Sequence, residues 1–328
     1  MCNHLVKPPC ETVTAMCTHR ASQALDRSTL SPTGELVIAD TPEGVMRRNT
    51  MHNRVVADAF VPGGGRPMTI NLANHKDFMV DEDTPSAKVV VEGANLFLTA
   101  EARRALFDTC GLPIVKDSSA NKCGVICSSM EILASMALSD EEFLAIKDEY
   151  VPQVVDRLRF LARNEAKMLF AEAGRDPSTP LPQISEQISI AILRCKTAVG
   201  QTLDRFDEPN RYRLWPIIQE QLPSSICEQY GGRLQERVPW EYQKQMIASG
   251  LASRMVYREG LAFVRAMPDS RLPSFALAYL QQEQRVRQLA KDVASSGMDF
   301  SSEVEALLLK GGVRIAAEEA AIKAAIKN

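Results

Sequence analysis

The sequence predicts an α/β protein in which part of a doubly wound parallel sheet precedes an all-helical C-terminal region. Two observations lead to this prediction. In residues 36–138, short apolar runs end in turns rich in Gly and Pro, and after Ser139 apolar residues recur at helical spacing. We therefore divide the 328 residues into an irregular N-terminal segment (1–35), an α/β segment (36–138) and a helical segment (139–328).

Three short apolar runs predict the strands, and they end at Val61, Val91 and Val115. Between the last two runs, apolar residues lie near helical spacing, at Leu98, Ala102, Leu106 and Cys110. Thr99 is a candidate N-cap of this helix, and Gly111 a candidate residue just past its end. A strand, a helix and a second apolar strand predict a βαβ unit in a parallel sheet.

The helical segment begins at Ser139-Asp-Glu-Glu, where a Ser cap precedes acidic residues of a first turn. From there a helical pattern runs in pieces to about Ala173, and the stretch "DPSTPLP" ends it. Further helices are expected over residues 183–206, 240–267, 272–294 and 303–326.

The composition is that of an ordinary globular protein, with 45% hydrophobic and 24% charged residues. A net charge of −3 gives no reason to expect nucleic acid or a membrane surface as a partner. No stretch approaches the ~18 apolar residues of a membrane helix. The N-terminus lacks a signal-peptide core, and the eight Cys residues indicate reduced thiols. We therefore expect the protein to be located in the cytoplasm or the mitochondrial matrix.

All three predicted strands end in loops whose residues suit a ligand. These loops are residues 62–66 (Pro-Gly-Gly-Gly-Arg), 92–95 (Glu-Gly-Ala-Asn) and 116–128. Glycines allow close backbone approach, and asparagines offer both a donor and an acceptor to amide-like groups. Because ligands of open parallel sheets bind beyond the carboxyl ends of the strands, we expect a small-molecule site there.

The third loop leads into a helix within "KDSSANKCGVICSSMEIL", residues 116–133. Unpaired N–H groups at a helix N-terminus favour a carboxylate or phosphate, and Ser128 is placed to add a hydroxyl. The buried stripe of this helix is expected at Val125, Ile132, Leu133 and Met136.

A thiol or metal site is the alternative in this stretch, because Cys123 and Cys127 can share a helix face. No histidine or other cysteine lies nearby in sequence to complete a tetrahedral set, so small packing cysteines are the simpler interpretation. A second possible ligand set comprises Cys2, His4, Cys10, Cys17 and His19. Its spacing fits no zinc module, and we assign no metal.

No acid/base pair or activated nucleophile stands out in the sequence, and we assign no catalytic residue. Glu92 is the nearest candidate, since it precedes Gly93 at a strand end. A carboxylate that caps neighbouring loop amides is the preferred interpretation of Glu92.

Four stretches carry a family resemblance: "RNTMH", "DAFVPGGGRPMTIN", "VVVEGANLFLT" and "KDSSANKCGVICSSMEILASMAL". In this order they resemble the carboxyl-terminal part of the large-subunit NAD-dependent glutamate dehydrogenases, over roughly Arg48–Leu138. In the smaller enzymes of that wider family the corresponding loops read EGAN-G-P and NAGGV-x-x-S. The resemblance implies that residues 36–138 are the distal half of a Rossmann-like dinucleotide-binding domain.

The resemblance also assigns site residues. Asn95 matches an asparagine near nicotinamide and substrate, and Asn121 a second one that holds the nicotinamide ribose and amide region. Ser128 matches the serine that binds the distal carboxylate of glutamate. Gly63 and Gly64 match a small pair that lets the cofactor approach. Cys123 departs from the pattern, which has glycine there.

The implied cofactor is NAD, and the implied reaction is oxidative deamination of L-glutamate to 2-oxoglutarate and ammonia by a homo-oligomeric parent enzyme. The family's catalytic lysine and aspartate and its GxGxxG-type loop have no match in this sequence. We therefore expect a fragment or truncated product that is inactive in isolation.

Two rival interpretations remain open at this point. One is a non-enzymatic helical regulatory or assembly module derived from such an enzyme. The other is a dehydrogenase of the same superfamily that acts on Leu, Val or Phe.

Overall fold

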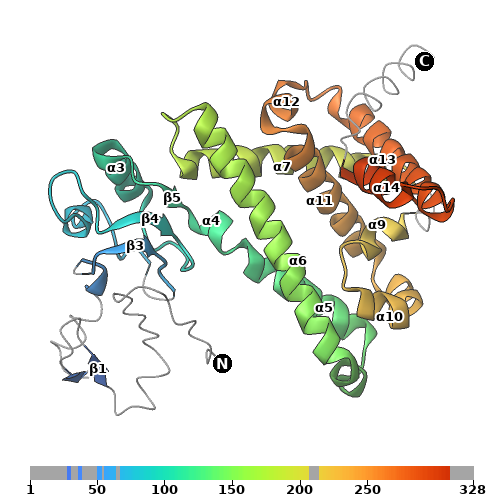
Figure 1. The fold of residues 1–328 in the computed structure, drawn as a ribbon, viewed down its shortest axis with the longest axis horizontal. Coiled ribbons are helices and arrows are strands. Elements are labelled where there is room, and N and C mark those ends of the chain that lie inside the picture. Colours follow the sequence, from blue (N-terminus) through green and yellow to red (C-terminus); the bar gives the residue numbers. More distant parts are fainter. Residues whose placement is uncertain are drawn as a thin grey trace. The chain divides into compact units, whose positions relative to one another are not determined.

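The computed structural model describes residues 28–30, 36–38, 50–53, 55–63, 67–206 and 214–310. The chain forms two compact units. The first comprises Met1–Lys122 with Asp176–Pro182, and the second Cys123–Arg175 with Gln183–Asn328. Every described strand lies in the first unit, and the described residues of the second are helices and their connections (Figure 1).

The main sheet of the first unit contains β3 (Ala57–Phe60), β4 (Ala87–Val91) and β5 (Ile114–Val115), in that order. Both neighbouring pairs are parallel, and the helix α3 (Ala100–Cys110) connects β4 to β5. The predicted fold class is therefore confirmed: a small parallel α/β region precedes helices. Nearer the N-terminus, β1 (Ser28–Leu30) and β2 (Leu36–Ile38) form a separate antiparallel pair.

Both predicted ends of α3 are confirmed. The Thr99 hydroxyl accepts a hydrogen bond from the Ala102 N–H at 3.2 Å, which satisfies a donor of the first turn. At the other end, Gly111 adopts a left-handed φ of 66° and donates its N–H to the Phe107 carbonyl at 2.8 Å. The chain therefore leaves α3 in a defined direction and enters β5.

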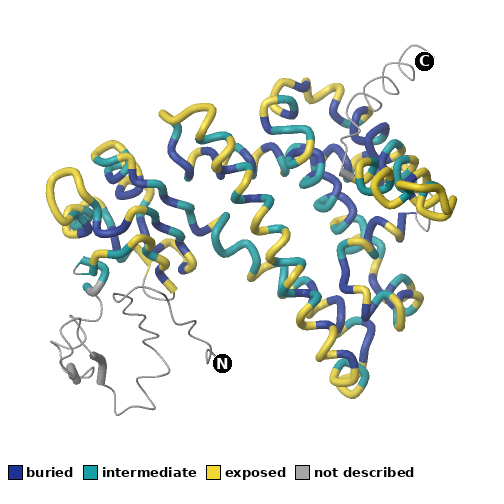
Figure 2. The backbone as a smooth tube through the Cα atoms, in the orientation of Figure 1, coloured by how far each residue is buried: buried dark blue, intermediate teal, exposed yellow. Residues whose placement is uncertain are grey.

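One face of α3 packs on the sheet, with Ala102 and Leu106 fully buried. Two short 3-10 turns, η1 (Met51–Asn53) and η2 (His75–Phe78), also belong to this unit, and Phe78 of η2 is buried. Figure 2 colours its buried positions dark blue. The core consists of Ile70, Phe78, Ala87, Val90, Ala94, Phe97, Leu98, Ala102, Leu106, Leu112 and Ile114.

Ten further helices follow β5 within the described residues, and the first, α4 (Asp117–Ala120), is a single turn. The others are α5 (Lys122–Ala137), α6 (Asp140–Arg175), α7 (Leu181–Leu203), α9 (Trp215–Gln219), α10 (Ser224–Arg237), α11 (Trp240–Glu259), α12 (Leu261–Ala266), α13 (Leu272–Ser295) and α14 (Ser301–Lys310). Among the described residues, no helix is long and apolar enough to cross a membrane.

Helix α6 starts as predicted. The Glu142 N–H bonds the Ser139 hydroxyl at 3.3 Å, and the Ser139 N–H bonds the Glu142 carboxylate at 2.9 Å, which is a capping box. Instead of running in pieces, α6 is continuous to Arg175 even though Pro152 lies inside it.

The helix predicted over 240–267 is divided at Gly260, whose φ of 95° lies outside the helical region. No sequence pattern predicts α9 or α10, because α9 is five residues long and two adjacent glycines interrupt α10. The last predicted helix is described only as far as Lys310, and its remainder lies outside the described residues.

The predicted buried stripe of α5 is largely wrong. Leu133 is buried, but Val125 is 73% exposed and Ile132 is 44% exposed. The buried residues are Met130, Leu133, Ala134 and Ala137. Because apolar residues surround α5, helical spacing fits more than one face. Packing against α6 selects the face, where the Tyr150 hydroxyl bonds the Met130 carbonyl at 2.8 Å.

Candidate functional site

The side chains of Asn95 and Asn121 meet beyond the carboxyl ends of β4 and β5. Asn95 lies in the loop after β4, and Asn121 caps the C-terminus of α4. The Asn121 side-chain amide donates a hydrogen bond to the Asn95 side-chain carbonyl. Asn95 is exposed and Asn121 half-buried, so donors and acceptors of both amides face the surface of the first unit. The structure thus places together the two asparagines that the sequence predicts as site residues.

Glu92, at the end of β4, supports this loop from inside. Its carboxylate is fully buried and accepts the Leu98 N–H at 2.9 Å. It also accepts two hydrogen bonds from Arg103 of α3, from Nε at 2.8 Å and Nη2 at 3.1 Å. The expectation that Glu92 caps loop amides is confirmed.

Asp117, the first residue of α4, supports the loop from the other side. The Leu96 N–H donates to its Oδ2 at 2.9 Å, and the Ser118 N–H donates to its Oδ1 at 2.8 Å. Arg103 Nη2 lies 3.8 Å from Oδ1, so one guanidinium faces both buried carboxylates. The main-chain carbonyl of Asp117 accepts the Asn121 N–H at 2.9 Å.

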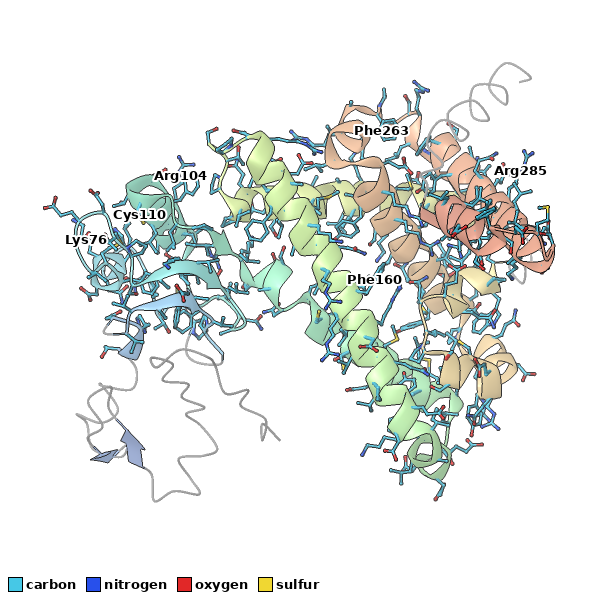
Figure 3. All side chains as sticks on the ribbon, viewed as in Figure 1. Lys76, Arg104, Cys110, Phe160, Phe263 and Arg285 are labelled. Carbon is cyan, nitrogen blue, oxygen red and sulfur yellow. The ribbon has the colours of Figure 1, made fainter. Side chains whose placement is uncertain are left out.

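Sequence reasoning missed Arg103 and Asp117, because charged residues are usually exposed. One signal for Arg103 was available: it shares a helix face with Thr99 and Leu106, at the spacing that predicts burial. The neighbouring Arg104, labelled in Figure 3, is an exposed contrast that pairs with Asp108 along the surface of α3.

The glycines of the strand-end loops differ in how tightly they are packed. A Cβ atom on Gly93 would lie 3.0 Å from the Pro62 carbonyl oxygen, which also accepts the Ala94 N–H at 2.7 Å. This close approach joins the ends of β3 and β4. Gly63 is exposed, with open space around its Cβ position. Its role at the cofactor stays a prediction, and Gly64 lies outside the described residues.

Ser128 is the seventh residue of α5 and belongs to the second unit. Its hydroxyl is exposed and donates to the Gly124 carbonyl at 3.2 Å within the helix. Ser128 therefore lies beyond the first four residues, whose N–H groups lack intrahelical partners. Its role in binding the distal carboxylate of a substrate stays a prediction.

The cysteines of α5 make weak contacts, one with α6 and one within α5. Cys123 Sγ lies 3.7 Å from the Leu158 carbonyl oxygen, and Cys127 Sγ lies 3.6 Å from a Glu131 carboxylate oxygen. Burial, followed by the nearby Glu131 charge, raises the pKa of the Cys127 thiol, which opposes formation of a reactive thiolate.

The described residues contain no group of three His, Cys, Asp or Glu side chains that could hold a metal ion. The possible N-terminal ligand set lies outside the described residues, because all its members fall within residues 2–19.

Comparison with known proteins identifies the class to which this arrangement belongs. Residues 19–173 match the family described as Glutamate/Leucine/Phenylalanine/Valine dehydrogenase. The asparagine pair and Ser128 lie within the segment that matches this dehydrogenase family. No solved structure matches the chain.

The curated relatives that the chain matches are glutamate dehydrogenases, and those of Schizosaccharomyces pombe and Neurospora crassa are named NAD-specific. The chain is 33% identical over 245 residues to the probable NAD-specific glutamate dehydrogenase of Schizosaccharomyces pombe, covering 69% of this chain and 21% of that protein. Identity is 34% over 261 residues with glutamate dehydrogenase 2 of Dictyostelium discoideum, which covers 72% of this chain and 25% of that protein. Identity is 32% over 251 residues with the NAD-specific glutamate dehydrogenase of Neurospora crassa, which covers 72% of this chain and 23% of that protein.

The chain thus spans about a fifth to a quarter of the length of these relatives. The resemblance drawn from the four sequence stretches is confirmed. The comparisons do not favour the rival interpretation as a non-enzymatic module.

Proposed function

We propose that this chain supplies nicotinamide- and substrate-binding loops of an NAD-dependent glutamate dehydrogenase. The reaction is oxidative deamination of L-glutamate to 2-oxoglutarate and ammonia. The observation that carries the proposal is the Asn95–Asn121 pair at the ends of adjacent parallel strands, inside the segment of the dehydrogenase family. The names of all three relatives support glutamate as the substrate, and two of the names support NAD as the cofactor.

The donor set of the site fits a nicotinamide nucleoside. Two uncharged carboxamides can each donate to and accept from the carboxamide and ribose hydroxyls of such a ligand. Asn95 and Asn121 orient the ring and ribose, and Gly63 and Gly64 leave room for the cofactor backbone. When bound, NAD supplies the ring that accepts a hydride.

Ser128 binds the distal carboxylate of glutamate through its exposed hydroxyl. A hydroxyl at this point suits a substrate with a second carboxylate better than the apolar side chains of Leu, Val or Phe, because only the carboxylate can accept a hydrogen bond from it. Glutamate is therefore the proposed substrate rather than the other amino acids of the family.

Neither nucleic acid nor a membrane is a proposed partner, because the net charge of −3 gives no basic surface excess. A homo-oligomeric parent enzyme and a location in the cytoplasm or the mitochondrial matrix stay predictions.

Binding and turnover of the purified chain test the proposal. NAD and nicotinamide mononucleotide should shift the side-chain NH₂ signals of Asn95 and Asn121 in ¹⁵N-edited NMR spectra. Asn121→Ala should abolish the nucleotide-induced shift of the Asn95 signals, whereas the control Asn164→Ala, on α6, should leave that shift unchanged. Chain that shows no response to either nucleotide contradicts the proposed function.

The same chain, mixed with glutamate and NAD, should give no change in NADH absorbance. The assigned site consists of two amides, a hydroxyl and glycines, and none of these accepts the substrate proton near neutral pH. Measurable turnover would show that a proton acceptor in this chain has been overlooked.

A further inference from the structure

One residue, Asp117, is bonded both to the neighbour of Asn95 and to Asn121 itself. The Asp117 side chain accepts the N–H of Leu96, which follows Asn95, at 2.9 Å. Its main-chain carbonyl accepts the N–H of Asn121 at 2.9 Å. The same carboxylate caps the start of α4 through the Ser118 N–H at 2.8 Å. Asp117 therefore connects the loop after β4 to the turn after β5.

The bond from Leu96 restrains a strained backbone. Leu96 has a φ of 54°, in the left-handed region that side chains other than glycine rarely adopt. Its carbonyl accepts the N–H of Met68, itself left-handed at 58°, at 2.7 Å. Both side chains are largely exposed, 58% for Leu96 and 62% for Met68, so burial does not explain the strain. Hydrogen bonds from both sides hold Leu96 in this conformation.

Asp117 is itself held in place by charge. The Asp117 side chain is 11% exposed, and Arg103 Nη2 lies 3.8 Å from its Oδ1. Glu92 fixes the orientation of that guanidinium through two hydrogen bonds. Both Asp117 oxygens thus face donors inside the first unit, and neither is left to take a proton from a substrate.

We propose that Asp117 is a positioning residue that sets the geometry of the Asn95–Asn121 pair without joining it. The proposal rests on the proposed function for its role in nucleotide binding. Its structural part, the geometry of the pair, does not depend on any ligand. A loop forced into a left-handed turn presents Asn95 at one angle, and Asp117 maintains that turn.

The test compares Asp117→Asn with the matched control Asp108→Asn in the purified full chain. The amide introduced at position 117 would place a donor against a backbone N–H or Arg103, whereas Asp108 is an exposed carboxylate that pairs with Arg104. Asp117→Asn should shift or broaden the side-chain NH₂ signals of Asn95 and Asn121. Affinity for nicotinamide mononucleotide should fall about tenfold, and Asp108→Asn should change neither.

Rescue separates positioning from general destabilisation. Glycine adopts a left-handed φ without strain, so Leu96→Gly reduces the need for Asp117 at this turn. Added to Asp117→Asn, it should restore the asparagine signals and most of the lost affinity. Without rescue, Asp117 acts only through overall stability and the proposal is overturned.

A second variant covers the case in which Asp117→Asn does not fold. Asp117→Glu keeps the charge for Arg103 but displaces the carboxylate by one methylene, away from the Leu96 N–H. It should fold and still perturb the asparagine signals. Unchanged signals in either folded variant would refute the proposal. If the unaltered chain binds no nucleotide, the proposed function fails, but the ligand-free signals still decide the role of Asp117.

Discussion

Replacement of Glu92 by glutamine tests whether the buried charges hold the first unit together. Glu92 is completely buried, and its partner Arg103 is 8% exposed. Glu92→Gln keeps the size and shape of the side chain but removes its charge. The amide oxygen can still accept the Leu98 N–H and Arg103 Nη2, while the new NH₂ group, in the place of Oε2, faces the Arg103 Nε donor. The expected result is a large loss of stability confined to the first unit.

The magnitude follows from the geometry of the pair. Breaking a buried ion pair by removing one partner costs ~3–5 kcal/mol, since the other charge stays buried. Arg103 keeps a longer contact to Asp117 at 3.8 Å, so we expect the lower end, about 3 kcal/mol. Each ~1.36 kcal/mol changes an equilibrium constant tenfold. A loss of about 3 kcal/mol therefore raises the population of the locally unfolded first unit by about a hundredfold or more.

Backbone hydrogen exchange is the suitable assay, because a chain with two units need not unfold in one step. Amides of β4 and α3, such as those of Val90 and Leu106, should exchange about a hundredfold faster in Glu92→Gln. Amides of α13 should not change. Asp58→Asn is the matched control: its pair with Lys88 joins β3 and β4, and both side chains are more than 80% exposed. This control should leave exchange unchanged.

A double-mutant cycle identifies the cause of the loss. Arg103→Met combined with Glu92→Gln should cost less than the sum of the two single changes, because the double variant leaves no unpaired buried charge at this pair. Two results would refute the reasoning: additive losses, or exchange in Glu92→Gln no faster than in Asp58→Asn.

Two further predictions concern stability elsewhere. Gly111→Ala should cost about 1 kcal/mol, because alanine is strained at a φ of 66°, whereas Gly232→Ala, at an exposed interior position of α10, should gain about 1 kcal/mol. The denaturant midpoint should fall for Gly111→Ala and rise for Gly232→Ala, and midpoints that shift in the same direction would contradict the prediction. Burial raises the pKa of the Cys195 thiol from 9.0 to about 11. The unfolded thiol ionises first as pH rises, so about 2–3 kcal/mol of stability is present below pH 9 and lost between pH 9 and 11. Denaturant midpoints measured as a function of pH should therefore fall less between pH 9 and 11 for Cys195→Ala than for the unaltered chain.

Elements defined by local interactions were predictable from the sequence. The ends of α3 depend on the Thr99 hydroxyl and on the left-handed Gly111, and both act on neighbours within four residues. The start of α6 at Ser139 is equally local. The parallel pairing of β4 and β5 was also predictable, because a helical crossover (α3) connects the two strands.

The buried face of α5 was not predictable from spacing alone. Apolar residues occur on several sides of this helix, and only its packing with Tyr150 of α6 shows which side is buried. Val125 is the clearest failure: it is apolar, fits a stripe and is 73% exposed.

The candidate site also contains residues that the sequence predicts and facts that only the structure shows. Asn95, Asn121 and the cap role of Glu92 could be inferred, because strand-end loops of a parallel sheet converge and the motifs around them are specific. Their meeting is a fact of the structure, and the ligands they bind remain a proposal.

By itself, then, the sequence determined the fold class, the helix caps and the choice of the two asparagines, since caps and strand-end motifs depend on residues that lie close together in the chain. Only the tertiary structure decided that Arg103 and Asp117 are buried, and that Leu96 is held in a left-handed turn beside the pair. A charged side chain becomes structural when partners distant in sequence neutralise it. Glu92 and Arg103, and Leu96 and Asp117, become neighbours only after the strands and α3 have packed.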